Sequence, residues 1–553
     1  MNKFYLTFLL FFLFCSHLVL AQDRYAVFYK NKAGTEFSLD KPEDFLTQKA
    51  LQRRIREGIS IDSTDLPVSP KYIQEVEKHT DYLLYHSKWM NASLIVADLE
   101  TISILEQLPF VDHIEKVAKG FIPRPNDRMQ SQGYETKIRK FLPLDNAPAR
   151  TLANEELPTD FQNSLLGIDK MHEEGFKGEG IIIAVFDVGF PGVNTINAFS
   201  HLIRNGQIID QKDFVRPWSS NVFTDHPHGT NVLSLIGAYE EGTFVSGAPN
   251  AEYFLAITEE LATEYQIEEY NWLRAAEYAD SIGVDIINSS VGYFDFDDPS
   301  MNYSFGELDG QTTIITQAAN LASAKGILVI SSVGNYGPNE PSLTAPSDSP
   351  DVLAIGSVNQ DLTVVNSSSR GPTGDGRLKP DLVAFGNGLP IIRINGNVGL
   401  GYGTSFTAPQ VAALAAGLWQ AKPEWTREEL IDELLRSATQ FDNPDNTFGY
   451  GIPDFYKAYF GEILSVEEKT EEQPWNVYPN PLIGNELKIN FGSGLKSNFT
   501  LIDLSGRVIR TKELERFNNK NPFEISLEGI PSGLYLIQLQ DQVELKYRKL
   551  IRH

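Results

Sequence analysis

The chain has 553 residues, of which 42% are hydrophobic, and a formal net charge of -26 at pH 7. Its length predicts about three folded units rather than one. The negative charge argues against a nucleic acid as partner, because the phosphates would be repelled.

The N-terminus predicts an export signal. A positively charged start and an apolar run from Phe4 to Leu20 lead to Ala21, after which cleavage is expected. Residues 1–21 are therefore interpreted as a signal peptide rather than a membrane anchor, and the mature chain is expected to lack a transmembrane segment. The only cysteine, Cys15, lies inside this signal, so neither disulfides nor thiol chemistry are expected in the mature protein.

Residues 22–119 read as a compact α+β domain. Strands are expected at Tyr25–Tyr29, Met90–Ala97 and Phe110–Val117, and helices at Asp44–Arg56 and Leu99–Leu108. Residues 120–160 are polar, charged and rich in proline, which predicts a linker and a cleavage region.

Residues 161–461 predict an α/β domain with a parallel sheet and helices on both faces. Short apolar runs alternate with helical stretches, and the expected strands are Ile181–Phe186, Val284–Ile287, Ile327–Ser332 and Val352–Val358. Sheets of this kind place their sites at the carboxyl ends of strands. Asp187 and Asn335 both stand just after such a strand.

Residues 462–474 form a second, acidic linker, and residues 475–553 predict a small β-sandwich. A hairpin turn is expected at Leu504–Arg507 between two strands. A closing strand, Tyr535–Leu539, is expected to lead into the basic end Lys546–His553.

Ser405 is a candidate nucleophile. Gly403 permits a tight backbone before it, and the small-residue stretch Thr407–Ala416 predicts a helix whose first turn tolerates Pro409. Free backbone N–H groups at that end would stabilise negative charge. The Gly-x-Ser-x-Gly elbow is absent, which argues against an α/β-hydrolase esterase. On its own, Ser405 could equally be a helix cap.

A base, an acid and an oxyanion donor are available elsewhere in the chain. His228 opens a small-residue helix beside a glycine, and Asp187 could accept its imidazole N–H. On their own, His226 and His228 could be surface residues or metal ligands, but a metal-ligand role is disfavoured because neither a cysteine nor a third histidine lies nearby. The side-chain amide of Asn335 could donate to an oxyanion, although a simple turn residue is the alternative.

In their order along the chain, Asp187, His228 and Ser405, with the Asn335 loop, resemble the subtilisin-like (subtilase) family from about Phe161 to Phe460. Further similar stretches are Asn288–Gly292, Ser367–Pro372 and Lys379–Ala384. The resemblance implies that Ser290, Val291 and Gly292 pair with a peptide substrate as an added β-strand. Val188 and Asn231 depart from the usual family residues, but neither departure removes a catalytic group.

The flanking regions also resemble known domains. Residues 22–119 are similar to a subtilase propeptide, which implies help in folding and inhibition of the enzyme by its own propeptide. The tail carries Tyr478–Pro481, Asp503–Gly506 and Gly533–Tyr535 and resembles a type IX secretion sorting domain. This resemblance implies outer-membrane secretion machinery as a partner and a secreted or cell-surface location in a Gram-negative bacterium. A generic adhesion module is the alternative for the tail.

The sequence thus predicts a secreted serine endopeptidase that cleaves protein or peptide substrates through an acyl-enzyme on Ser405. The alternatives are a non-catalytic surface-binding or adhesion protein on the same scaffold and a maturation protease with one partner. No cofactor is required and no metal site is assigned. The acidic loop Asp295–Asp298 leaves a structural calcium ion open, with a solvated turn as the alternative.

Overall fold

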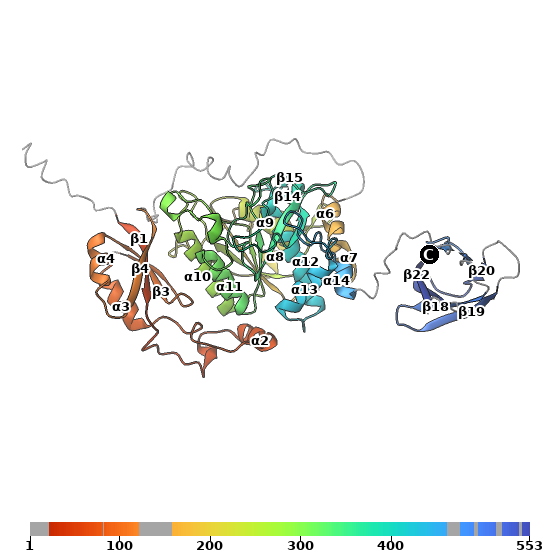
Figure 1. Cartoon of the computed structure of the whole chain (residues 1–553), viewed down its shortest axis with the longest axis horizontal. Coiled ribbons are helices and arrows are strands. Elements are labelled where there is room, and N and C mark those ends of the chain that lie inside the picture. Colours follow the sequence, from red (N-terminus) through yellow and green to blue (C-terminus); the bar gives the residue numbers. More distant parts are fainter. Residues whose placement is uncertain are drawn as a thin grey trace, which may run out of the picture. The chain divides into compact units, whose positions relative to one another are not determined.

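The computed structural model describes residues 22–80, 82–120, 157–461, 476–490, 496–515, 523–540 and 545–553. The predicted signal peptide and most of both predicted linkers lie outside these residues. The chain divides into one unit at Met1–Tyr459 and a second at Phe460–His553, each of which is described by itself (Figure 1).

The first unit begins with an antiparallel sheet whose strand order is β2-β3-β1-β4. The strands are β1 (Asp23–Tyr29), β2 (Tyr82–Ser87), β3 (Ala92–Ala97) and β4 (Val111–Ala118). Helices α3 (Pro70–Glu77) and α4 (Leu99–Leu105) cover one face, where Val76 and Leu105 are buried against Val27. The predicted α+β arrangement is confirmed.

A seven-stranded parallel sheet follows, with the order β13-β12-β11-β10-β5-β9-β6. Its strands are β5 (Ile182–Asp187), β6 (Ile208–Asp213), β9 (Glu252–Ile257), β10 (Ile286–Ser289), β11 (Leu328–Ser332), β12 (Val352–Val358) and β13 (Leu382–Phe385). All four predicted strands are present, and the predicted α/β fold with a parallel sheet is confirmed.

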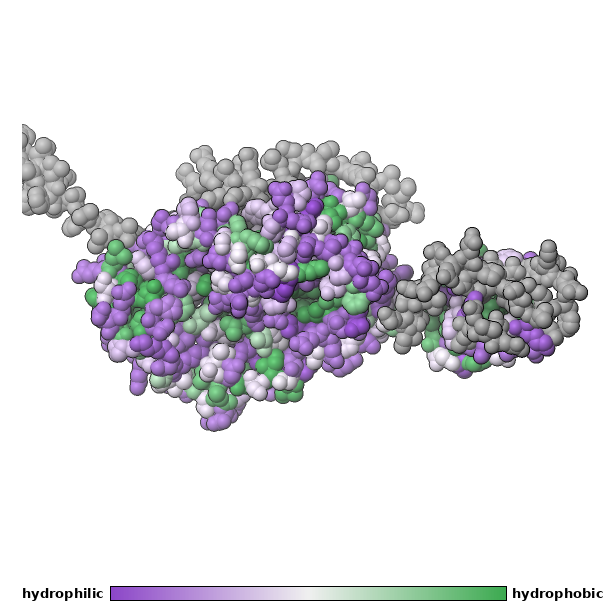
Figure 2. Space-filling view, in the orientation of Figure 1, coloured by the Kyte–Doolittle hydropathy of each residue, from purple (hydrophilic) through white to green (hydrophobic). Residues whose placement is uncertain are grey.

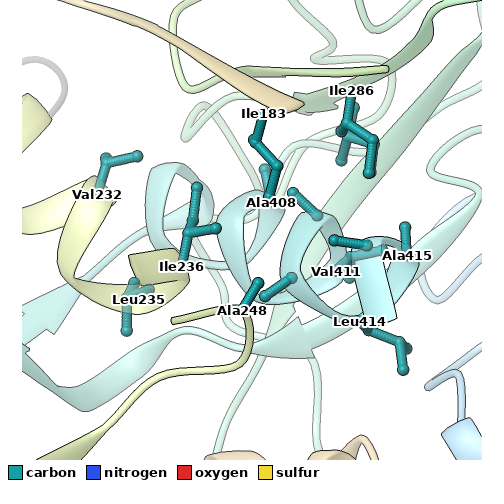
Figure 3. Close-up of a cluster of buried hydrophobic side chains, with 14 of the residues drawn as sticks. Ile183, Val232, Leu235, Ile236, Ala248, Ile286, Ala408, Val411, Leu414 and Ala415 are labelled. Atoms are coloured by element: carbon teal, nitrogen blue, oxygen red, sulfur yellow. The ribbon is translucent and has the colours of Figure 1, made fainter. Parts of the chain in front are cut away.

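Helices cover both faces of this sheet because its strands are apolar on both sides. Ile183 and Val185 face a cluster formed with α9 (His228–Gly237) and α12 (Ala408–Ala421). Figure 3 shows Ile183 directly above Ala408 of α12, with Ile236 of α9 in the same cluster. Successive strand side chains alternate between faces, so Ala184 and Phe186 instead join a cluster with α10 (Ile267–Ile282) and α11 (Ile314–Ala324).

Smaller elements complete the first unit. The helices are α6 (Asp160–Leu165), α7 (Ile168–Glu173), α8 (Ser200–Arg204), α13 (Arg427–Ser437) and α14 (Phe455–Phe460). Short strand pairs are β7 (Tyr239–Glu240) with β8 (Phe244–Val245) and β14 (Asn387–Ile392) with β15 (Val398–Tyr402). The 3₁₀ turns are η1 (Pro42–Asp44), η2 (Asn197–Phe199), η3 (Pro299–Met301), η4 (Phe305–Glu307) and η5 (Thr404–Phe406).

The N-terminal domain contacts the parallel-sheet domain within this unit. Trp89 and Leu94 from its sheet join the cluster that contains α10. Farther along, helix α2 (Gln48–Arg56) reaches the C-terminal ends of α10 and α11. The predicted helix Asp44–Arg56 therefore starts later than expected, because Thr47 caps it and the preceding residues form η1.

Two arginines of α2 bind the C-termini of these two helices. Arg53 donates to the carbonyl oxygens of Asp280 (3.1 Å) and Lys325 (3.1 Å), and Arg54 donates to that of Lys325 (2.6 Å). The buried Asp280 carboxylate pairs with both guanidinium groups. Cations at these ends donate to carbonyls of the last turn and also interact favourably with the helix dipole.

The second unit consists of two antiparallel sheets, β16-β17-β20 and β19-β18-β21-β22, that share one hydrophobic core. Their strands are β16 (Asn476–Tyr478), β17 (Glu486–Asn490), β18 (Lys496–Asp503), β19 (Val508–Glu515), β20 (Phe523–Ser526), β21 (Gly533–Gln540) and β22 (Leu545–Arg552). The predicted hairpin at 504–507 is confirmed. The predicted closing strand Tyr535–Leu539 is not the last one: the basic end forms β22, with Leu550 buried in the core.

The face shown in Figure 2 is mostly hydrophilic, with small hydrophobic patches between the polar side chains. Within the described ranges, every helix is too short or too polar to cross a bilayer.

Candidate active site

Strand β5 carries Asp187 to the carboxyl edge of the sheet, where its side chain is fully buried. The Oδ1 atom accepts a hydrogen bond from the Val188 N–H (2.8 Å), and the Asp187 carbonyl accepts one from the Thr258 N–H (3.1 Å). Because β5 lies between β10 and β9, the position of the carboxylate is fixed from both sides.

His228 is the first residue of α9 and faces Asp187 directly. Its Nδ1 lies 2.8 Å from Oδ1 and 2.9 Å from Oδ2 of Asp187. The imidazole is 7% exposed, and its Nε2 has no hydrogen-bond partner among the described residues. An imidazole whose Nδ1 is hydrogen-bonded to a carboxylate and whose Nε2 has no partner has the arrangement of a general base.

This contact depends on a glycine that follows the histidine. A Cβ atom on Gly229 would lie 2.4 Å from the carbonyl oxygen of Gly189 and 3.0 Å from the Cβ of Asp187. Such separations are far below van der Waals contact, so only glycine lets the start of α9 approach the end of β5 this closely.

Ser405 lies in η5, just before α12, and is 3% exposed. Its Oγ donates to the carbonyl oxygen of Ser290 (3.2 Å), while the Ser290 hydroxyl donates to the carbonyl of Ser405 (2.8 Å). No hydrogen bond joins Ser405 to His228. The next residue, Phe406, packs against the histidine, with 5.5 Å between ring centroids. The structure thus gathers all three predicted residues, with Asp187 and His228 in contact.

Asn335 follows β11 and contacts the serine turn. Its Oδ1 accepts hydrogen bonds from the backbone N–H (3.0 Å) and the hydroxyl (3.3 Å) of Thr404. Gly403, with φ of +112°, lies beside it, and a Cβ there would be 3.2 Å from Oδ1. With its oxygen held in this way, the amide can present Nδ2 as a donor next to Ser405.

The predicted substrate-binding segment, Ser290 to Gly292, follows β10 and adjoins the serine. The next residue, Tyr293, forms an antiparallel bridge to Ala345 through two backbone hydrogen bonds of 3.0 Å. A Cβ on Gly292 would meet the Thr344 hydroxyl at 2.4 Å, so a side chain at this position is excluded.

His226 lies beside the predicted base, and its Nδ1 accepts a hydrogen bond from the His228 N–H (3.3 Å). Burial and the neighbouring His228 lower the pKa of His226 to about 4. His226 is therefore neutral near pH 7 and does not add a second positive charge beside His228.

The sequence reasoning missed a buried acidic group next to this site. The hydroxyl of Tyr293 donates to Oε1 of Glu259 (2.5 Å). Burial raises the pKa of Glu259 to about 7 and that of Glu268 well above its ordinary value. Glu259 stands two residues after the end of strand β9, just as Asp187 stands at the end of β5. An acidic residue at the carboxyl end of a parallel strand is the sequence signal that could have identified it.

The carboxylates of the acidic loop 295–298 have partners within the protein. The Asp297 carboxylate accepts from the backbone N–H of Glu264, and Asp298 is paired with Lys119 and accepts from Ser300. In the part of the chain that the structure describes, no group of three His, Cys, Asp or Glu residues could hold a metal ion.

Three protein-family models match this chain. Residues 178–451 match the Subtilase family, residues 24–132 match the Peptidase S8 propeptide domain of Bacteroidota, and residues 476–553 match the Secretion system C-terminal sorting domain.

The individual relatives share less than a third of their aligned residues with this chain. The chain is 27% identical over 58% of its length to Subtilisin-like protease SBT6.1 of Arabidopsis thaliana, and spans 29% of that protein. It is 28% identical to Subtilisin E of Bacillus subtilis over 51% of the chain and 65% of that relative. The epidermin leader peptide processing serine protease of Staphylococcus aureus has the same fold, with a TM-score of 0.53 and 15% identity over 79% of this chain and 99% of its own.

Proposed function

Residues 178–451 are a subtilase-family serine protease domain, and from this premise we propose that the chain is an exported endopeptidase that acts through Ser405. The observation that best supports this proposal is the contact of His228 Nδ1 with both carboxylate oxygens of Asp187, within 2.9 Å, beside the turn that holds Ser405.

In the proposed reaction, the Ser405 hydroxyl turns from the Ser290 carbonyl towards Nε2 of His228, which takes its proton. The alkoxide attacks the peptide carbonyl, and Asp187 stabilises the imidazolium that forms. The Asn335 amide and the Ser405 N–H donate to the oxyanion. The protonated His228 then protonates the leaving amine, and water hydrolyses the acyl-enzyme with the same base.

The substrate is a protein or peptide that adds an extended strand along Ser290, Val291 and Gly292. The N-terminal domain is proposed to act as an inhibitory propeptide that is removed by cleavage between residues 120 and 160. Residues 22–119, 161–461 and 475–553 would then be the propeptide, the protease and the sorting domain. The sorting-domain match favours secretion or a cell-surface location, with the secretion machinery as partner.

A fluorophosphonate probe tests the nucleophile, because it reacts only with an activated serine. We expect the processed, propeptide-free protein to carry the label on Ser405, as read by peptide mass spectrometry. A His228→Ala variant should lose the label and a Ser405→Ala variant should have no labelled site. A folded, processed protein that takes no label would instead indicate a binding protein on a protease scaffold.

A further inference from the structure

We propose that two acidic loops beside the substrate-binding segment form a subsite that selects a basic side chain in the substrate. The loops are residues 258–266, which follow β9, and residues 294–298, which follow the segment at 290–292; together they are called the acidic loops. Their acids are Glu259, Glu260, Glu264, Asp295, Asp297 and Asp298. This inference rests on the proposed protease function.

The two loops are bonded to each other and to the substrate-binding segment. The Asp297 N–H donates to the Glu264 carbonyl (2.8 Å), and the Glu264 N–H donates to the Asp297 carboxylate (3.1 Å). Glu259 accepts from Tyr293, the residue directly after Gly292. Glu259 is therefore held next to the backbone on which the substrate is expected to lie, and Asp297 is held against the neighbouring loop.

In this structure the propeptide domain places a cation on each loop. Arg24 pairs with Glu260, and both side chains are at least nine-tenths buried. Lys119 Nζ lies 2.8 Å from the Asp298 carboxylate. Arg24 stands opposite Ala118 across β1 and β4, so both cations lie where the propeptide chain leads towards the proposed cleavage region.

Two buried side chains at the acidic loops, Arg24 and Glu268, have polar atoms without a hydrogen-bond partner among the described residues. Nε and Nη2 of Arg24 have no hydrogen-bond partner among the described residues, although the side chain is 3% exposed. Oε1 of Glu268, in the first turn of α10, also has no partner there and is 2% exposed. A buried polar group without a partner is costly, and a polar or charged group of a ligand can satisfy it.

Removal of the propeptide withdraws Arg24 and Lys119 together. Tyr293 still donates to Glu259 and the Thr263 hydroxyl still donates to Glu260 (2.9 Å), so the protease domain keeps a preformed acidic site in which Glu260 has lost its cation. A guanidinium or ammonium group of the substrate can then take the position that Arg24 leaves, whereas an acidic side chain would be repelled. Because the propeptide precedes its own cleavage region, we expect the selected residue on the N-terminal side of the scissile bond.

Matched peptides test this on the processed enzyme. Fluorogenic peptides that carry Arg, Gln or Glu at one position before the scissile bond are compared by kcat/KM. The substituted position is moved along the residues that precede the scissile bond. At one of these positions we expect kcat/KM to be about tenfold higher for the Arg peptide than for the Gln peptide, and this ratio should fall to about twofold in Glu260→Gln. A Glu260→Lys variant should favour the Glu peptide, whereas Glu241→Gln, an exposed acid between β7 and β8, should keep the wild-type ratio.

The wild-type enzyme alone can decide the question if a variant fails to fold. Added guanidinium chloride should inhibit cleavage of the Arg peptide more than that of the Gln peptide. Equal kcat/KM for Arg and Gln at every position, or a preference that Glu260→Gln leaves intact, overturns the inference while hydrolysis continues. Loss of all hydrolysis together with absent fluorophosphonate labelling would instead contradict the proposed function.

Discussion

The hydroxyl of Ser405 donates its hydrogen bond to the carbonyl oxygen of Ser290, 3.2 Å away, rather than to His228. That carbonyl belongs to the segment expected to bind the substrate backbone. A peptide N–H that occupies the Ser290 carbonyl would compete with the hydroxyl and free it to turn towards Nε2 of His228. In the proposed reaction, substrate binding and activation of the nucleophile would thereby be linked through a single acceptor.

Asp187→Asn should reduce kcat by about 10³- to 10⁴-fold, because an amide can present a donor to Nδ1 and favour the wrong imidazole tautomer. The matched control is Asp213→Asn, which changes another buried aspartate at the end of a strand, bonded to Arg216. Steady-state kinetics on processed protein measure both effects. Similar losses in the two variants would show that Asp187 has no special part in the reaction.

Asn335→Ala should lower kcat by about 10²- to 10³-fold with little change in KM, because an oxyanion donor acts mainly in the transition state. Asn335 also accepts hydrogen bonds from Thr404, so the variant could act by moving the serine turn. Thr404→Val removes the hydroxyl bonds to Asn335 and to the Gly334 carbonyl (3.1 Å) but leaves the Asn335 amide in place, and it controls for that movement. An equal loss of kcat in both variants would contradict the donor role.

Gly229→Ala should disrupt the contact between Asp187 and His228, since its new methyl group would overlap the Gly189 carbonyl. We expect a lower melting temperature, and we expect a large loss of kcat even at temperatures where the variant is still fully folded. Gly306→Ala is the control, because the nearest atom to its Cβ would be 4.0 Å away. Unchanged kinetics in Gly229→Ala would mean that α9 can shift without affecting the site.

The docking of helix α2 should weaken at acidic pH. Burial alone would raise the pKa of Asp280, but Arg53, Lys88 and Arg54 together lower it to about 2. The stabilisation is therefore complete above an unfolded pKa near 3.8 and is lost as the pH falls towards 2, a change of about 2 kcal/mol.

Hydrogen exchange between pH 5 and pH 2 can follow this change. After correction for intrinsic rates, amides of α2 should lose protection relative to those of α4, which belongs to the same N-terminal domain. Parallel loss of protection in both helices would indicate general unfolding and contradict a local role for Asp280.

Much of the fold follows from pattern alone. The strands of the parallel sheet are buried on both faces, so their continuous apolar runs stand out, and Val352–Val358 matches its predicted bounds. The last strand, β22, was not predicted because Lys546, Arg548 and Arg552 mask a weak alternation in which Leu550 is fully buried. Helix α2 began later than predicted because a capping threonine ended the apparent continuity.

In the candidate site too, some residues could be predicted from the sequence and others could not. Asp187, His228, Ser405 and Asn335 could be named from sequence because each stands at the end of a strand or the start of a helix, where the fold dictates its place. Glu259, Tyr293 and Arg24 could not, because their association joins segments far apart in the chain. Such pairings depend on how loops pack, which no local periodicity records.

The stability of the protein should fall as the pH rises from about 4.5 to about 8, because burial raises the pKa of Glu269 to about 8 although Tyr303 and the Ile315 N–H donate to it. A raised carboxyl pKa stabilises the fold fully below the unfolded value and loses that contribution as the pH rises through the folded one. The change is about 5 kcal/mol at most.

Glu269→Gln removes the titration and should flatten the profile of stability against pH, as measured by urea unfolding at pH 5 and pH 8. Glu428→Gln, an exposed acid on α13, should retain the wild-type slope. A Glu269→Gln profile as steep as the wild type would show that other groups control the pH dependence.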